Sequence, residues 1–207
     1  MNRLMITAAI ALGLFATQPA SASTIIDTGP GPSEGGGFTL SPNQSLAAEF
    51  DLTQDYTITS VEGWISTLAD ESGFFSASIF SDDGDVPGTV LFSSQFEGPT
   101  LLSYEWRGVY DLDWSLAAGS YWVVFSGEPG SRAFMPFPSP NPLDNGAFKT
   151  DGPWVAEDNI KIGVRIRGAV APIPEPSAWA MLLLGLGAVG GALRFAKRKH
   201  NVTVSLV

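Results

Sequence analysis

The 207-residue chain contains no cysteine and only one histidine. Without cysteine it can form neither a disulfide bond nor a thiolate metal site. The single histidine, His200, lies close to the C-terminal end, so the preceding residues have no imidazole for a Ser-His-Asp triad, a Cys-His pair or a histidine-ligated metal. These two absences exclude most hydrolase and metalloenzyme chemistry from the middle of the chain. A domain built there without disulfides has to depend on its hydrophobic core.

Positive charge is also scarce in the middle of the chain. Between Ser23 and Pro176 there are six Lys and Arg residues but all 21 Asp and Glu residues, which gives this segment a net charge of −15. Such an acidic domain repels phosphate backbones, so no nucleic-acid partner is expected. The charge is compatible with calcium binding, with neutral or cationic polymers as partners, and with simple solubility outside the cell.

Long apolar runs are restricted to the two ends. At the N-terminus Arg3 precedes an apolar run over residues 4–16, and Ala20 and Ala22 place small residues at the −3 and −1 positions before Ser23. The run is short for a hydrocarbon core of ~30 Å. This arrangement predicts a helical signal peptide over residues 1–22, exported by the Sec machinery and cleaved before Ser23.

At the other end, residues 178–193 are apolar apart from glycines, and a basic cluster follows them. As a helix, these residues and the next turn span roughly the thickness of a bilayer. The basic cluster consists of Arg194, Lys197, Arg198 and Lys199. The positive-inside rule then predicts a transmembrane helix with this cluster in the cytoplasm and the acidic domain outside the inner membrane.

Directly before this apolar run stands the tripeptide Pro174-Glu175-Pro176. Neither proline fits a helix interior, so an extended, exposed stretch is expected between domain and membrane. Tripeptide, apolar helix and basic cluster together resemble the PEP-CTERM sorting signal over residues 171–200. The resemblance implies that an exosortase, a membrane protease of Gram-negative bacteria that make extracellular polysaccharide, recognises Pro174, Glu175 and Pro176. Residues 201–207 extend beyond the usual end of such tails.

Between the two ends, strand signals recur and long helical periodicity does not. In residues 160–167 isoleucine or valine alternates with lysine, glycine or arginine, which is typical of a half-buried strand. Further predicted strands cover residues 46–52, 56–66, 74–80, 89–96, 104–112 and 120–126. We therefore predict an all-β fold, an antiparallel β-sandwich of jelly-roll type over residues 46–170. Residues 23–45 are expected to form a first strand and a flexible lead-in, the latter over residues 28–37, and residues 136–145 a stiff surface loop.

One loop between predicted strands is rich in carboxylates. Asp82, Asp83 and Asp85 could supply oxygen ligands to calcium, and Gly84 permits a tight turn. The spacing does not fit an EF-hand, and an ordinary hairpin of turn-forming residues explains the run equally well. This strand–turn–strand element also resembles one that is common in the ectodomains of PEP-CTERM proteins. No cofactor is expected otherwise.

Tryptophan is the other feature of this segment. Trp64 and Trp122 lie on predicted strands and are expected in the core. Trp154 follows Asp151-Gly152-Pro153 in a loop-like stretch, where its indole could stack on a sugar ring or pack inward.

The leading interpretation is an exported, non-enzymatic cell-surface or matrix protein, sorted by an exosortase and associated with extracellular polysaccharide or biofilm. A calcium-dependent carbohydrate-binding module is one alternative. Another is a glycan hydrolase or lyase with a carboxylate pair such as Glu105 and Asp111 or Asp113, although 21 acids make such proximity weak evidence.

Overall fold

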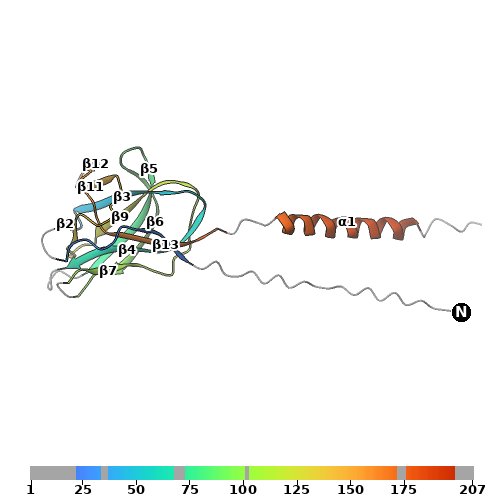
Figure 1. Ribbon diagram of the computed structural model, residues 1–207, viewed down its shortest axis with the longest axis horizontal. Coiled ribbons are helices and arrows are strands. Elements are labelled where there is room, and N and C mark those ends of the chain that lie inside the picture. The colour runs from blue at the N-terminus through green and yellow to red at the C-terminus, as the bar shows by residue number, and fades with distance from the viewer. Residues whose placement is uncertain (1–21, 34–36, 68–72, 101–102, 172–175, 199–207) are drawn as a thin grey trace, which may run out of the picture. The chain divides into compact units, whose positions relative to one another are not determined.

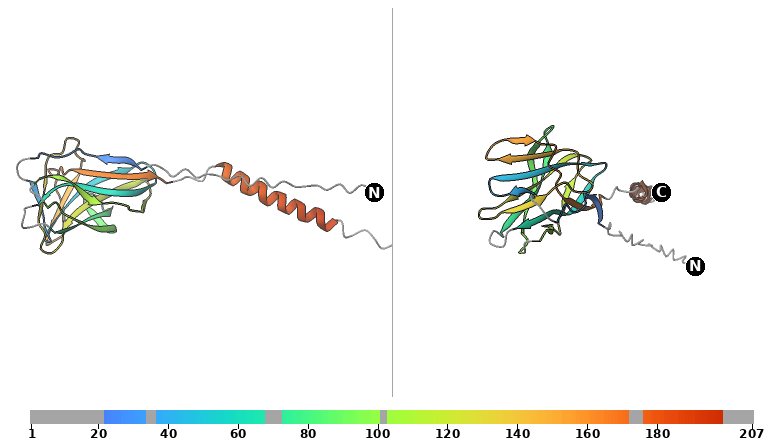
Figure 2. Two further views of the ribbon diagram at one scale, coloured as in Figure 1. Left: turned by 90° about the horizontal axis from the view of Figure 1, so that it is seen from below. Right: turned by 60° about the vertical axis from the view of Figure 1, so that its left-hand side comes forward.

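The computed structural model describes residues 22–33, 37–67, 73–100, 103–171 and 176–198. The chain divides into two units, Met1–Val170 and Ala171–Val207. In the described residues, the first unit contains thirteen strands and the second contains a single helix, α1 (Pro176–Arg198). Up to Val170 the coloured ribbon consists of strands and loops, without a helix among the described residues (Figures 1 and 2). The predicted signal peptide, apart from Ala22, lies outside the described residues.

The first sheet has seven strands arranged around β4. Its order is β1-β13-β4-β10-β2, and β7 and β8 also pair with β4. These strands are β1 (Ser23–Asp27), β2 (Gly37–Leu40), β4 (Tyr56–Thr67), β7 (Glu105–Val109), β8 (Trp114–Leu116), β10 (Ala133–Pro136) and β13 (Val164–Val170). All of their pairings are antiparallel.

The second sheet has six strands in the order β12-β11-β3-β9-β5-β6, and its pairings are again antiparallel. These strands are β3 (Gln44–Leu52), β5 (Phe74–Asp82), β6 (Pro87–Glu97), β9 (Gly119–Gly127), β11 (Gly146–Thr150) and β12 (Trp154–Ala156). In β3, Leu46, Ala48 and Phe50 alternate with residues that point to the other face, so a single strand serves both the core and an outer face.

The core lies between the two sheets. Buried residues of β4 and β13, such as Val61 and Ile166, form one cluster with buried residues of β3, β5 and β9, such as Leu46, Phe75 and Phe125. Because both sheets supply one apolar face to the same cluster, the architecture is the predicted antiparallel sandwich. The jelly-roll subclass stays a prediction.

One prediction about local structure was wrong. The strand predicted over residues 160–167 begins only at Val164, although Ile160 and Ile162 are buried as their alternation predicted. Ile160 and Lys161 bond to loops instead of a neighbouring strand: the N–H of Ile160 donates to the Glu157 carbonyl, and the Lys161 carbonyl accepts from the N–H of Ser139.

The lead-in predicted over residues 28–37 begins with a buried, hydrogen-bonded residue, and its flexibility stays a prediction. Thr28 follows directly on β1 and is almost completely buried. Its backbone N–H donates to the carbonyl of Val164 at 3.0 Å, and its Oγ1 accepts from the N–H of Val164 at 2.7 Å. Hydrogen bonding to β13 therefore continues past the end of β1.

Candidate functional site

The carboxylate loop forms the hairpin between β5 and β6. The N–H of Asp83 donates to the carbonyl of Val86 at 3.1 Å, and Gly84 has a φ of 75°, a left-handed conformation that favours glycine. Within the described residues, no group of three or more acidic side chains is arranged to hold a metal ion. Asp82, Asp83 and Asp85 are therefore not brought together as the calcium hypothesis requires. Asp82 instead accepts a hydrogen bond from Nε1 of Trp122 at 2.9 Å.

Trp122 is buried, as predicted, but not between the sheets. Its exposed fraction is 0%, and it belongs to a small cluster with Ala47, Val124 and Ala147 on the outer face of the six-stranded sheet. Phe80 and Trp154 pack against this cluster. The outer face of the second sheet thus carries a second, smaller apolar core.

Trp154, the predicted carbohydrate-stacking residue, lines a pocket on this outer face. The half-buried indole meets the ring of Phe80 edge-on, with centroids 6.0 Å apart. The pocket has a volume of about 320 Å³, within the range of small-ligand sites. Its lining residues are Pro42, Asn43, Ser45, Phe80, Val124, Ser126, Lys149, Asp151 and Trp154. We call it the Trp154 pocket.

The polar rim of the Trp154 pocket contains one cation and one anion. Lys149 and Asp151 are both exposed, and no ion pair between them is found among the described residues. Ser45 and Ser126 are bonded to each other at 2.7 Å between their Oγ atoms. Asp151 has a φ of 45°, a conformation that non-glycine residues seldom adopt and that recurs at ligand sites. The rim can therefore donate to and accept from a polar ligand on the aromatic floor.

The outer face of the seven-stranded sheet has a different chemistry. Glu62 of β4 is 5% exposed, and one of its oxygens, Oε1, accepts from the hydroxyl of Tyr110 at 2.9 Å. Desolvation, followed by this hydrogen bond and the negative charge of Glu62, raises the pKa of Tyr110 to about 12. Trp64, predicted in the core, is half-buried here and meets the ring of Trp106 at 5.4 Å.

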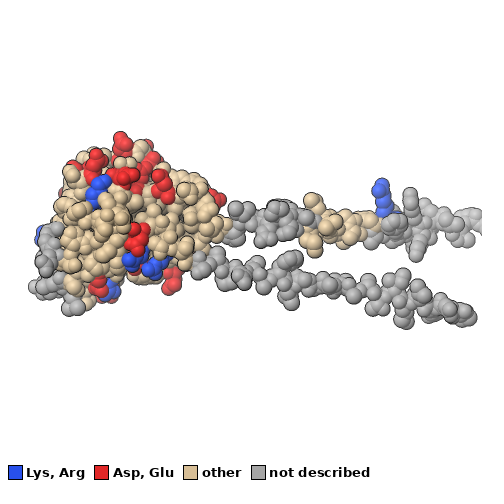
Figure 3. Space-filling model, viewed as in Figure 1, with Lys and Arg blue, Asp and Glu red and all other residues tan. Residues whose placement is uncertain are grey.

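The acids proposed for a carboxylate pair lie at the edge of this sheet. Glu105 of β7 forms an ion pair with Arg107 at 3.0 Å. Asp111 follows β7 with a φ of 54°, and Asp113 precedes β8. Acidic side chains are spread over several parts of the face in Figure 3, which agrees with an acidic surface more than with one localised pair.

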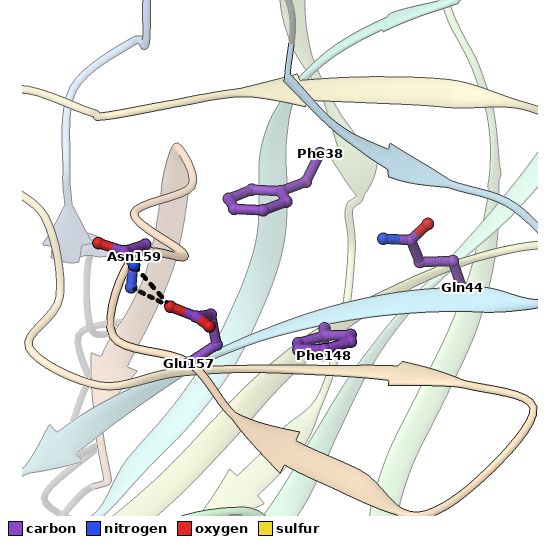
Figure 4. Close-up of a pocket in the computed structure, with 5 residues that line it drawn as sticks. All are labelled: Phe38, Gln44, Phe148, Glu157 and Asn159. Atoms are coloured by element: carbon purple, nitrogen blue, oxygen red, sulfur yellow. Dashed lines mark hydrogen bonds between the residues drawn. The ribbon is translucent and has the colours of Figure 1, made fainter.

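A further pocket was not predicted from the sequence. It has a volume of about 350 Å³ and is lined by Phe38, Gln44, Phe148, Glu157 and Asn159 (Figure 4). The five residues come from β2, β3, β11 and the turn after β12, so they are up to 121 positions apart in the sequence. No local motif joins them, and only the pairing of the strands brings them together. We call it the Phe38–Phe148 pocket.

The C-terminal unit contains the predicted helix. α1 begins at Pro176, the last residue of the predicted recognition tripeptide, in the first helical turn where proline is tolerated. The apolar side chains described along it, such as Leu183 and Leu184, are exposed, and so is Arg194. Among the described residues, no helix combines the length and the apolar character needed to cross a membrane. Pro174, Glu175 and Lys199 lie outside the described residues.

Comparison with family models decides what this unit is. Residues 172–199 match the model of the PEP-CTERM protein-sorting motif. The chain carries a PEP-CTERM sorting motif. The match includes the tripeptide and all four cations of the basic cluster, which confirms the resemblance found in the sequence. It leaves the sandwich and residues 200–207 outside, and no curated protein matches the chain. The PEP-CTERM motif indicates an exported protein whose sorting depends on an exosortase.

Proposed function

We propose that this chain is a non-enzymatic surface or matrix protein that associates with extracellular polysaccharide after an exosortase has processed its tail. The PEP-CTERM motif at residues 172–199 is the observation that carries the proposal. In this scheme the signal peptide exports the sandwich through the Sec machinery. The apolar helix then holds the chain in the inner membrane, with Arg194, Lys197, Arg198 and Lys199 on the cytoplasmic side, until cleavage near Pro174-Glu175-Pro176.

The boundaries of the sandwich support this order of events. β1 begins at Ser23, the residue that would become the new N-terminus after cleavage behind Ala22. β13 ends at Val170, two residues before the sorting motif begins. Both cleavages would therefore remove segments that lie outside the sandwich and would leave every strand intact.

Association with polysaccharide is supported by the surface of the sandwich. The Trp154 pocket combines two aromatic side chains, Trp154 and Phe80, with exposed polar groups at its rim. Aromatic faces stack on the apolar faces of sugar rings, and polar rims bond their hydroxyls. A non-enzymatic role is supported by the lack of histidine and cysteine in the sandwich and by the pairing of Glu105 with Arg107.

The sorting part is tested by replacing Pro174, Glu175 and Pro176 with alanine in the full chain, in a host that contains an exosortase. We expect the wild type to yield a mature form without its tail, and the variant to keep the tail and accumulate in the membrane fraction. Intact mass spectrometry of both forms gives the cleavage positions.

A matched control replaces two prolines and one acidic residue elsewhere in the chain. Pro140, Pro142 and Asp144 are exposed in the loop after β10 and offer this combination. Their replacement by alanine should leave processing unchanged. If the tripeptide variant is processed like the wild type, the proposed sorting route is wrong.

A further inference from the structure

The Phe38–Phe148 pocket is formed where the two sheets come together at one side of the sandwich. Phe38 belongs to β2, at the end of the seven-stranded sheet, whereas Gln44 and Phe148 belong to β3 and β11 of the six-stranded sheet. In Figure 4 the rings of Phe38 and Phe148 lie on opposite sides of the pocket. Gln44 lies at one end, and Glu157 and Asn159 lie together at the other. An apolar middle is thus bounded by polar groups at both ends.

Both aromatic rings pack against other apolar side chains of the sandwich. Phe38 stacks on Phe137, with ring centroids 4.3 Å apart and an interplanar angle of 26°. Phe148 packs against the main core. A ring whose rotamer is fixed by packing loses little conformational entropy when a ligand stacks on it, so the two faces are preorganised.

The acidic end of the pocket is also fixed. Oε1 of Glu157 accepts from the Nδ2 of Asn159 at 2.7 Å and from its backbone N–H at 3.3 Å. The turn is tied to β11, because the N–H of Glu157 donates to the carbonyl of Gly146 at 2.8 Å. A Cβ at Gly146 would lie 2.9 Å from the Glu157 carbonyl, so glycine permits this close approach. The carboxylate therefore has a defined direction.

Hydrogen-bonding capacity remains at both ends. No hydrogen bond of Glu157 Oε2 or of the Gln44 side-chain amide is found within the described part of the chain. The Gln44 amide offers donors and an acceptor, and Glu157 offers an acceptor. A ligand that suits these groups has apolar faces of ring size and hydroxyls around its edge.

We propose that the Phe38–Phe148 pocket binds a neutral sugar residue of an extracellular glycan. The pyranose ring would lie between the two phenylalanines, and its edge hydroxyls would bond Glu157 and Asn159 at one end and Gln44 at the other. A negatively charged sugar is disfavoured by Glu157 and by the net acidity of the domain. The volume of about 350 Å³ lies at the lower end of small-ligand sites, which suits one or two rings and not a long chain segment.

This inference deepens the proposed association with polysaccharide, but it places the contact at a site separate from the Trp154 pocket. Gln44 and Ser45 are neighbours in β3, as Phe148 and Lys149 are in β11. Successive side chains of a strand point to opposite faces, so the two pockets use opposite faces of the same two strands. A domain with two such sites could hold two glycan segments at once.

The experiment uses the purified full chain in a detergent without a sugar headgroup. Cellotetraose and chitotetraose serve as neutral probes, and a tetramer of galacturonic acid serves as the anionic one. Saturation-transfer NMR reports contact with the protein, and a titration gives the dissociation constant. We expect at least one of the two neutral probes to bind. The anionic probe should bind more weakly than that probe or not at all.

Two variants locate the site without removing its packing. Phe38→Leu keeps an apolar side chain but loses the ring face, and Gln44→Ala removes one polar end. Each should weaken binding of the neutral probe by up to about tenfold, the value of one aromatic or hydrogen-bond contact. The matched controls are Phe74→Leu and Gln95→Ala, at exposed positions away from the pocket, which should bind like the wild type.

Three results would overturn the proposal. They are no saturation transfer to either neutral probe, preferential binding of the anionic probe, and neutral binding that Trp154→Ala abolishes while Phe38→Leu and Gln44→Ala leave it unchanged. None of these results bears on the tail, because processing of the PEP-CTERM motif is read from the mass of the mature protein. The two proposals can therefore fail separately.

Discussion

The polar side chains on the outer faces of the two sheets differ in how completely they are hydrogen-bonded. On the six-stranded sheet, serines bond one another across strands, as Ser78 and Ser93 do at 2.8 Å, and beside them lies the Trp154 pocket. On the seven-stranded sheet, β4 carries three buried polar atoms without a hydrogen-bond partner: Ser60 Oγ, Glu62 Oε2 and Trp64 Nε1.

This difference indicates that the outer face of the six-stranded sheet is suited to ligand binding, whereas that of the seven-stranded sheet is sensitive to the loss of a hydrogen bond. A face whose serines bond one another beside an open aromatic pocket can accept a ligand without first breaking strong internal bonds. A face with buried, incompletely bonded groups has a high cost for any further loss, because each unsatisfied buried group costs free energy. We expect substitutions on the first face to act through its small apolar core and those on the second to act through Glu62.

The largest effect is expected for Trp122→Ala on the six-stranded sheet. This side chain is completely buried beneath an outer face, and its removal should lower the free energy of unfolding by about 3–5 kcal/mol through a cavity. Urea unfolding followed by circular dichroism measures the loss. Trp154→Ala, half-buried at the edge of the same cluster, should cost clearly less. If both variants lost the same free energy of unfolding, Trp122 would not be the central residue of this cluster and Trp154 would not be peripheral to it.

The second effect tests the other face. Tyr110→Phe removes the hydrogen bond to Glu62 and leaves the carboxylate buried, so unfolding should become easier by about 1–3 kcal/mol. The control is Tyr121→Phe, whose hydroxyl donates to the carbonyl of Ala117 at an exposed position. Water can replace that partner, so the control should change stability little. A similar loss in both variants would remove the contrast between the two faces.

Sequence alone predicted the C-terminal sorting motif more fully than the middle of the chain, for a physical reason. The sorting motif is read as a linear segment, so Pro174-Glu175-Pro176, the apolar run and the basic cluster identify it without a fold. Strands such as β3, β5 and β9 were also predicted, because alternation of apolar residues is local. The short strands β2, β8, β10, β11 and β12 were missed, since three to five residues carry too little periodicity.

The candidate sites depend on contacts between residues that are distant in the sequence, and local sequence patterns do not predict these contacts. Trp122 was expected in the core because it lies on a strand, yet the sequence does not say on which side of a sheet a fully apolar strand places each residue. The partnership of Asp82 with Trp122 joins residues 40 positions apart. Phe38 and Phe148 line one pocket only because β2 and β11 belong to different sheets that pack together.

The smallest expected effect is a pH dependence of the free energy of unfolding, which depends on Tyr110. Tyr110 is 51% exposed, and the fold raises its pKa from 10.0 to about 12, first through partial desolvation and then through the hydrogen bond and charge of Glu62. The neutral phenol is favoured in the folded state, so this stabilisation is complete below pH 10. As the pH rises further, the unfolded chain loses its proton first, and the contribution is lost by about pH 12. Unfolding should therefore become easier across this interval.

Other tyrosines and lysines also titrate at alkaline pH, so the measurement has to be a difference. Urea midpoints of the wild type and of Tyr110→Phe are compared below pH 10 and near pH 12, with the absorbance of the phenolate recorded in parallel. The wild type should lose its advantage over the variant as the pH rises. An advantage that persists unchanged above pH 12 would show that the hydroxyl stabilises the sheet by packing alone. In that case the buried carboxylate of Glu62 would not be what distinguishes this face from the serine-lined one.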